Sequence, residues 1–259
     1  MSRYRFAHNK VMCDVFEPSG PTRNVSLFLY GFPAMIGPNK MTDLLVSHGF
    51  VVLQPHYPGT YDSAGTFDPF SAADAVATIV EAIRDGKVQD LRSNKTRHIS
   101  PAITACVGYC FGCNVALRSL PVLTHLRSLI LASPALTIGP ATVSSGFVAY
   151  GPPLLEYVKR SRPYTYRLGK LGKWMQLYDG HLNQPTGKCP SSLRTVLGLA
   201  GAEDERFDHS VLKQNSHTII KRFVGDQATV SFLFIPGADH RIDSLLDKDA
   251  RLAVLQALG

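Results

Sequence analysis

Short, almost entirely apolar runs alternate with segments of helical periodicity along most of the chain. The apolar runs lie at 25–30, 50–53, 103–107, 129–132, 195–200 and 229–235. Runs of this kind are typical of strands that are buried on both faces of a parallel sheet. Segments with apolar side chains at helical spacing lie between or after them, at 39–48, 68–85, 114–120, 210–224 and 242–258. We therefore expect an α/β fold in which a mainly parallel sheet is flanked by helices.

Three stretches depart from this alternation. Residues 4–17 mix apolar and polar positions and predict one or two opening strands before a turn at 18–21. Residues 87–99 are polar and basic, and we expect them to lie on the surface. Residues 134–192 are rich in glycine, proline and aromatic side chains. A structureless loop of that length is uncommon within a compact domain, so this last stretch is expected to have structure of its own.

One apolar run ends in a five-residue motif that points to catalysis. Residues 103–107 lead into Gly108-Tyr109-Cys110-Phe111-Gly112, where two glycines flank one nucleophilic side chain at equal spacing. This is the spacing of the nucleophile elbow, with Cys110 in the place of serine. An elbow turns sharply from strand to helix, so the nucleophile has a strained backbone and side chains at the flanking positions would clash. Cys110 would then stand at a helix N-terminus, where the macrodipole favours a thiolate.

With this elbow the sequence resembles the α/β-hydrolase fold, and within it the dienelactone hydrolases, which carry a Cys-Asp-His triad. The likeness to dienelactone hydrolases covers the elbow and the order of the triad. In the segment Tyr30-Gly31-Phe32-Pro33 and in the stretch after residue 134, the chain looks more like capped esterases and thioesterases. The resemblance implies a core of residues 1–135 and 193–259, with a cap or lid inserted at 136–192.

The resemblance also implies where the other catalytic residues lie. In this fold an acid follows the penultimate core strand and a histidine follows the last. Asp204 comes soon after the run at 195–200, and His240 comes soon after the run at 229–235. We therefore predict a triad in which Cys110 is the nucleophile, His240 the base and Asp204 the acid that orients the base.

Several nearby side chains are alternatives to these choices. Glu203 and Asp208 are rivals for the role of the acid, and Asp204 is preferred because the family motif is Gly-x-x-Asp. His56, in the turn-rich loop after the run at 50–53, is an alternative histidine that could approach the site. Asp239, next to the predicted base, is expected to cap or orient its turn.

The resemblance places an oxyanion hole on two backbone groups. Its donors would be the N–H of Phe32, in the loop after the strand at 25–30, and the N–H of Phe111, directly after the nucleophile. Aromatic side chains near the elbow and in the cap are candidates to line an apolar substrate pocket, or alternatively to pack a small core of the cap itself. The pocket candidates are Tyr30, Tyr109 and Trp174.

A cysteine nucleophile limits the chemistry that such a site performs. A thiolate attacks activated acyl carbons well, and these include esters, strained lactones and thioesters. We expect a hydrolase that forms an acyl-enzyme on Cys110, with water as the acceptor of the acyl group. The alternative with the same triad is an acyltransferase or cyclase that releases a thioester-bound acyl chain to a second nucleophile.

A reading from another class rests on Cys110 and Cys113. The two residues form a C-x-x-C at a strand-to-helix junction, as in thiol-disulfide redox proteins, and Cys113 could also regulate Cys110 through a reversible disulfide. A zinc site that uses Cys106 as well is disfavoured because no fourth ligand is suitably spaced. We expect neither a metal nor a cofactor.

Composition and charge limit the classes of partner and the cell compartment that we expect for this protein. The chain has a net charge of +7, and basic residues are concentrated between Lys159 and Lys173. This segment is either a solvated surface or an attractant for an anionic or thioester-linked acyl substrate. No motif supports binding to nucleic acid, and no apolar segment supports a membrane partner or secretion. Five cysteines exclude a complete set of disulfides, and three of them lie within 106–113, so we expect a cytoplasmic protein.

Overall fold

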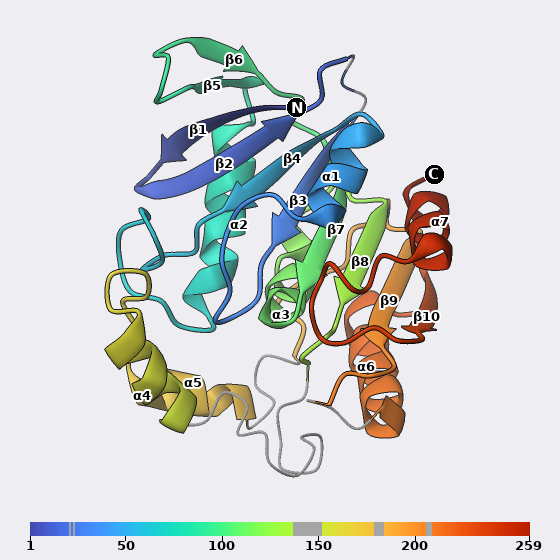
Figure 1. The fold of residues 1–259 in the computed structure, drawn as a ribbon. Helices are drawn as coiled ribbons and strands as arrows, with labels where there is room; N and C mark the ends of the chain where they lie inside the picture. The colour runs from blue at the N-terminus through green and yellow to red at the C-terminus, as the bar shows by residue number, and fades with distance from the viewer. Residues whose placement is uncertain (21, 23, 137–151, 179–183, 206–208) are drawn as a thin grey trace.

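A computed structural model describes residues 1–259 apart from 21, 23, 137–151, 179–183 and 206–208 (Figure 1). Within the described residues, eight strands form one sheet in the order β1-β2-β4-β3-β7-β8-β9-β10. These strands are β1 (Ser2–His8), β2 (Val11–Glu17), β3 (Asn24–Leu29), β4 (Phe50–Pro55), β7 (Ile103–Tyr109), β8 (Ser128–Ala132), β9 (Thr195–Gly201) and β10 (Thr229–Ile235). From β4 to β10 all neighbouring strands are parallel, whereas β2 is antiparallel to both β1 and β4. The α/β fold with a mainly parallel sheet is therefore confirmed.

Helices cover both faces of this sheet. They are α1 (Lys40–Ser47), α2 (Ser71–Ala82), α3 (Phe111–Arg118), a short 3₁₀ turn (Leu120–Val122), α4 (Pro152–Ser161), α5 (Leu171–Tyr178), α6 (His209–Val224) and α7 (Lys248–Leu258). Helices α2 and α3 pack together on one face, while α1 and α7 lie on the other (Figure 1). Strands β4 and β8 are buried along their whole length and β3 is buried after its first residue, as their apolar sequences predict.

Helix α3 lies unusually close to β3. A Cβ atom at Gly112 would lie 2.0 Å from the carbonyl oxygen of Leu29 and 2.9 Å from that of Tyr30. Only glycine fits at such a distance, because the first turn of α3 rests directly on the backbone of the strand. This contact fixes how far the start of α3 stands above the sheet.

The segment between β8 and β9 contains α4 and α5 where it is described. Helices α4 and α5 lie near the lower end of α2 (Figure 1). Two isolated bridges, Thr60 with Tyr166 and Phe67 with Leu168, join the segment to the loop after β4. Domain boundaries at 136 and 192 stay a prediction, since 137–151 and 179–183 lie outside the described residues.

Two expected elements differ from those observed. Residues 87–99, expected as plain surface, contain a hairpin of β5 (Lys87–Gln89) and β6 (Thr96–His98), which is too short to give a readable period. The last helix was expected over 242–258 but begins at Lys248. Asp247 caps it by accepting a hydrogen bond from the N–H of Ala250 at 2.7 Å, and Ser244 instead belongs to a turn bonded to Asp239.

None of the described helices is long and apolar enough to span a membrane.

The contact between α3 and β3 predicts a large effect of one methyl group. Replacing Gly112 by alanine should lower the free energy of unfolding by about 3 kcal/mol or more, because the added Cβ displaces backbone rather than a flexible side chain. Urea unfolding measures this change. Gly172→Ala, in α5, is the control: no atom lies within 4 Å of its Cβ position, so its stability should stay the same or rise slightly. Equal stability of the two variants would contradict the close approach.

Candidate active site

Cys110 lies at the point where β7 ends and α3 begins. Its backbone has φ 54° and ψ −116°, a conformation that L-residues rarely adopt. At Gly108 a Cβ would lie 2.7 Å from the carbonyl oxygen of Gly112 and 2.8 Å from the Cα of Cys113. This geometry is the sharp strand-to-helix turn that the sequence predicts, with glycine required at both flanking positions. Helix α3 begins at Phe111, three residues earlier than its side-chain pattern indicates.

Backbone hydrogen bonds hold the nucleophile position in place. The N–H of Cys110 donates to the carbonyl of Ala132, the last residue of β8, at 2.9 Å, and the N–H of Cys113 donates to the carbonyl of Cys110 at 3.1 Å. The Cys110 side chain is therefore fixed at the carboxyl end of the sheet, at the N-terminus of α3. Cys110 is only 3% exposed.

Asp204 and His240 form a buried pair beside Cys110. His240 Nδ1 lies 2.7 Å from Asp204 Oδ2, and the two residues are 4% and 2% exposed. Burial by itself lowers the pKa of His240. The negative charge of Cys110 and the hydrogen bonds with Asp204 and Cys110 outweigh this effect and raise the pKa of His240 to about 9. The structure thus brings the three predicted triad residues into one chain of contacts.

The loops after β9 and β10 are locked together, and this sets the position of the pair. A Cβ at Gly201 would lie 2.2 Å from the carbonyl oxygen of Ala238, so the two loops touch through their backbones. The N–H of Glu203 donates to that same carbonyl at 2.8 Å, and the N–H of Ala202 donates to the carbonyl of Ile235 at 2.9 Å. Because neighbouring parallel strands end side by side, these bonds bring Asp204 against His240.

Two further side chains hold the backbone of His240 in place. The hydroxyls of Tyr109 and Ser133 donate to the carbonyl of His240 at 3.2 and 3.1 Å. Ser133 follows β8 with a φ of 44°, and its N–H donates to the carbonyl of Leu199 at 2.7 Å. Ser133 was not among the residues predicted from the sequence. The available signal was a polar residue directly after a buried strand, at the sheet edge where such sites lie.

The loop after β3 lies against the nucleophile. A Cβ at Gly31 would lie 3.0 Å from the Cβ of Cys110, so the loop passes the cysteine at van der Waals distance. The rings of Phe32 and Phe111 are 6.4 Å apart, so the two residues expected to supply the oxyanion donors are neighbours in the structure. As the first residue of α3, Phe111 has an amide with no acceptor inside the helix. That these amides bind an oxyanion stays a prediction.

The three pocket candidates have different surroundings. Tyr109 is half-buried, and its ring lies 5.7 Å from the ring of His240. Tyr30 is buried, and its hydroxyl bonds to Thr60 Oγ1 at 2.8 Å and to the N–H of Tyr57 at 3.0 Å. Trp174 is buried with its ring 4.8 Å from that of Phe32. Tyr109 therefore lies beside His240, whereas the hydroxyl of Tyr30 faces Thr60 and Tyr57, and Trp174 packs against Phe32.

The rivals for the triad roles lie elsewhere or make other bonds. Glu203 is exposed, and Asp208 is outside the described residues. His56 is buried against the carboxylate of Asp14, with His56 Nε2 3.3 Å from Asp14 Oδ2. Asp239 accepts hydrogen bonds from the N–H of Arg241 at 2.9 Å and from Ser244 Oγ at 2.6 Å, which orients its turn.

Cys113 has few of the properties of a redox partner. Its thiol is buried and donates to the carbonyls of Gly108 and Ala132 at 3.3 and 3.5 Å. Burial raises the pKa of the Cys113 thiol well above its ordinary value, whereas exchange needs an accessible thiolate. Among the described residues, no three His, Cys, Asp or Glu side chains gather as a set of metal ligands.

Part of the basic segment after residue 158 is used inside the molecule. The guanidinium of Arg167 donates to the carbonyls of Tyr61 and Gly65 at 3.2 and 3.4 Å. Lys173 Nζ lies 2.8 Å from Asp68 Oδ2, and Lys159 pairs with Glu156 at 2.9 Å. Arg167 and Lys173 join the segment to the loop after β4, and the Lys159 pair lies within α4, so these charges contribute less to the attraction of an anion than their number indicates.

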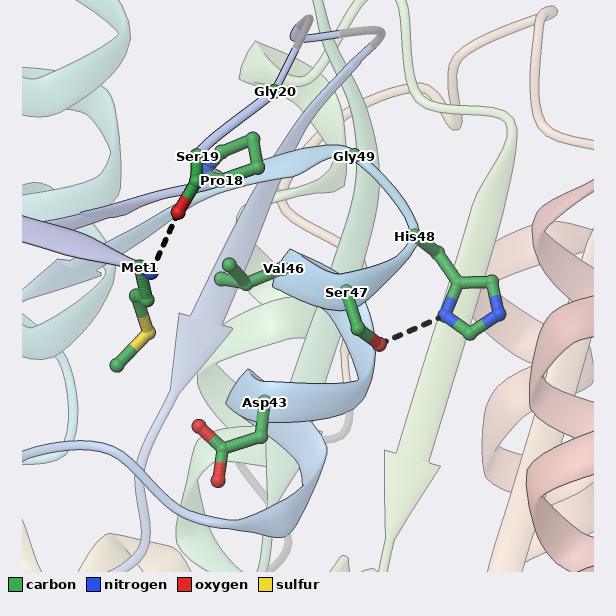
Figure 2. A pocket seen from close by; sticks show the side chains of 9 residues that line it. All are labelled: Met1, Pro18, Ser19, Gly20, Asp43, Val46, Ser47, His48 and Gly49. Carbon is green, nitrogen blue, oxygen red and sulfur yellow. Dashed lines mark hydrogen bonds between the residues drawn. The ribbon is translucent and has the colours of Figure 1, made fainter.

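A surface hollow of about 650 Å³ lies at the end of the sheet opposite to Cys110 (Figure 2). It is formed where α1 ends and β4 begins, which is the amino end of the strands, whereas Cys110 stands at their carboxyl end. Its position excludes it as the acyl pocket of the triad. The lining residues are Met1, Pro18, Ser19, Gly20, Asp43, Val46, Ser47, His48 and Gly49.

No protein-family model and no curated protein sequence matches this chain. Solved structures do resemble it. DcsB, in a complex with its substrate analogue, is 13% identical with a TM-score of 0.63, over 99% of this chain and 97% of that chain. A highly thermostable carboxyl esterase from Bacillus coagulans is 14% identical with a TM-score of 0.62, over 99% and 96%.

A third similar structure is the monoacylglycerol lipase of Paleococcus ferrophilus. It is 18% identical with a TM-score of 0.57, over 100% of this chain and 98% of that chain. At such identities the likeness concerns the arrangement of the backbone. Together with the strand order and the elbow, it establishes that the chain has the α/β-hydrolase fold.

Proposed function

We propose that this protein is a hydrolase that cleaves an activated acyl substrate through a Cys110-His240-Asp204 triad and an acyl-enzyme intermediate. The substrate class is an ester, a lactone or a thioester. The observation that carries the proposal is the buried pair of His240 and Asp204, 2.7 Å apart, in contact with a cysteine at the strained start of α3. Similar structures that include a carboxyl esterase and a monoacylglycerol lipase support acyl chemistry on this fold.

The geometry suits a sequence of two acyl transfers. The Cys110 thiolate attacks the acyl carbon, and the carbonyl oxygen becomes an oxyanion between the amides of Phe32 and Phe111. The protonated imidazole of His240 then gives its proton to the leaving group, and the thioester remains on Cys110. In the second half, neutral His240 takes a proton from water as the water attacks that thioester. Asp204 holds the imidazole orientation throughout.

The choice of activated substrates follows from the leaving groups. When the tetrahedral intermediate collapses, the better leaving group departs, and a thiolate departs more readily than an amide nitrogen. Attack on an amide by Cys110 would therefore mostly reverse, whereas a thioester, an enol ester or a strained lactone goes forward. Amides are expected to be poor substrates.

Burial of the triad favours a second candidate, transfer of the acyl group to a nucleophile other than water. Cys110 and His240 are 3% and 4% exposed, so bulk water has little access to a thioester formed there. An alcohol or amine of the substrate itself would then cyclise the acyl chain. Reaction in ¹⁸O-labelled water separates the two, because hydrolysis places the label in the released acid and cyclisation leaves the product unlabelled.

Loss of the Cys110 thiol should abolish turnover. We expect Cys110→Ala to lower kcat roughly 10³-fold or more on p-nitrophenyl and thioester acyl substrates, and Cys110→Ser to retain only part of the rate. Mass spectrometry of the wild type should find the acyl adduct on the peptide that contains Cys110. Cys189→Ser is the control, since this half-buried thiol accepts a hydrogen bond from Gln227, just before the amino end of β10, whereas His240 follows the carboxyl end of that strand.

Two outcomes would contradict this assignment. Full activity in Cys110→Ala, or a wild-type protein that turns over no acyl substrate, would refute the hydrolase. A thiol-disulfide exchange activity that needs both Cys110 and Cys113 would instead support the redox reading.

The raised pKa of His240 predicts the alkaline limb of the pH profile. Because His240 must be protonated to assist the leaving group, kcat/KM should fall as the pH rises through about 9. Asp204→Asn removes a hydrogen bond that favours the imidazolium, so the limb should move to lower pH and the rate should drop. Profiles between pH 6 and 11 measure this. Glu203→Gln, one residue away and exposed, should leave the limb in place; a shift in that variant instead would make Glu203 the acid.

A further inference from the structure

The oxyanion loop is held by a side chain from the distant segment between β8 and β9. Tyr166 places its hydroxyl on both backbone groups of Ala34: it accepts from the N–H at 3.0 Å and donates to the carbonyl at 2.6 Å. Ala34 is two residues beyond Phe32, whose amide is the expected oxyanion donor. One phenol thus holds both backbone polar groups of a single residue next to the site.

Tyr61 reinforces the same point from the loop after β4. Its hydroxyl donates to the carbonyl of Ala34 and accepts from the N–H of Ile36, the latter at 3.2 Å. Further along, the side-chain oxygen of Gln54 accepts from the N–H of Gly37 at 2.8 Å. The loop is therefore held at three successive places, and two of the three holding groups are tyrosine hydroxyls.

Tyr166 is itself rigidly placed. It is buried, and its ring meets the ring of Phe32 edge-on at 5.2 Å. Backbone bonds on either side fix its height: the N–H of Tyr61 donates to the carbonyl of Thr165 at 2.8 Å, and the N–H of Arg167 donates to the carbonyl of Gly59 at 2.7 Å. Because the hydroxyl of Tyr166 is held in this way, it in turn holds the backbone of Ala34 in one position.

Trp174, from α5 of the same segment, also packs against the ring of Phe32. The two rings are 4.8 Å apart and tilted by 31°, and Trp174 also lies 5.1 Å from the ring of Phe67. On its inner side the loop meets Cys110 through Gly31, where no space remains. Phe32 is consequently confined between the nucleophile and the segment that contains Tyr166 and Trp174.

We propose that Tyr166 is a positioning residue of the active site, which holds the amide of Phe32 at the place where the oxyanion forms by binding both backbone groups of Ala34. This rests on the proposed function. On this view the described residues 152–178, between β8 and β9, form one wall of the catalytic centre. Its contribution is expected in the transition state, because the hydrogen bond from Phe32 strengthens as negative charge develops on the oxygen.

The test compares Tyr166→Phe with Tyr164→Phe. Both variants lose one hydroxyl from the same segment, but Tyr164 is 92% exposed. We expect Tyr166→Phe to lower kcat roughly tenfold to a hundredfold with KM within about threefold, a smaller loss than removal of an oxyanion donor itself. Tyr164→Phe should match the wild type. Tyr61→Phe, which removes the other hydroxyl on Ala34, should change kcat in the same direction.

A second readout separates positioning from general damage. Iodoacetamide alkylates Cys110 by displacing iodide and creates no oxyanion, so its rate reports on the thiolate and His240 alone. Followed by mass spectrometry on the Cys110 peptide, this rate should change less than about twofold in Tyr166→Phe. Hydrogen exchange should rise at the amides of residues 32–36 in that variant and remain unchanged in Tyr164→Phe.

The outcomes distinguish this proposal from the one on which it rests. A wild type without acyl turnover overturns the proposed function. An active wild type whose Tyr166→Phe variant keeps its kcat overturns the positioning role alone, as does an equal fall of kcat and of alkylation, which would indicate a disturbed triad. A fall in kcat with unchanged alkylation and faster exchange at 32–36 supports it.

Discussion

Direct contact between the start of α3 and the backbone of β3 is the constraint on which the candidate site depends. With no side chain at Gly112, the helix rests on the carbonyls of Leu29 and Tyr30, and with none at Gly108 the turn closes behind it. The chain can make so tight a turn only if the residue between them takes a positive φ, and that residue is Cys110. The strain at the cysteine is therefore balanced by packing on either side of it, and the same contact sets the distance to the loop that begins at Gly31.

Sequence patterns predicted the elements that are long and buried. The run at 229–235 matches β10 residue for residue, and the helical stretch expected at 39–48 is α1, with Asn39 as its N-cap. Patterns were wrong where local bonds decided the structure. Apolar periodicity continued back to Ile242, but the turn made by Asp239 and Ser244 and the cap at Asp247 delay α7 to Lys248. The hairpin of β5 and β6 has strands of three residues each, too few for any period to be visible.

Some residues of the candidate site could be predicted from the sequence, and others could not. Cys110, Asp204 and His240 could be named in advance because each follows a strand, and the topology of a parallel sheet brings the ends of its strands together. Ser133, Tyr61 and Tyr166 could not. Each acts through a hydroxyl on the backbone of a residue far away in sequence, such as Ser133 on His240 and Tyr166 on Ala34, and nothing in the local sequence encodes the partner. Tyr30 was predicted as a pocket candidate, but its hydroxyl bonds to Thr60 and Tyr57 inside the protein, and the local sequence does not encode these partners either.

The bond between Tyr166 and Ala34 spans 132 positions, and this separation has a consequence for how the protein is made. A chain emerging from the ribosome exposes Ala34 first and Cys110 next, while Tyr166, Asp204 and His240 follow in that order. Contacts of such long range form late, because the entropy of closing the loop must be overcome before they contribute. Under the proposed function, the nascent protein therefore carries its cysteine before the residues proposed to activate it, and the site is complete only when the final strand has joined the sheet.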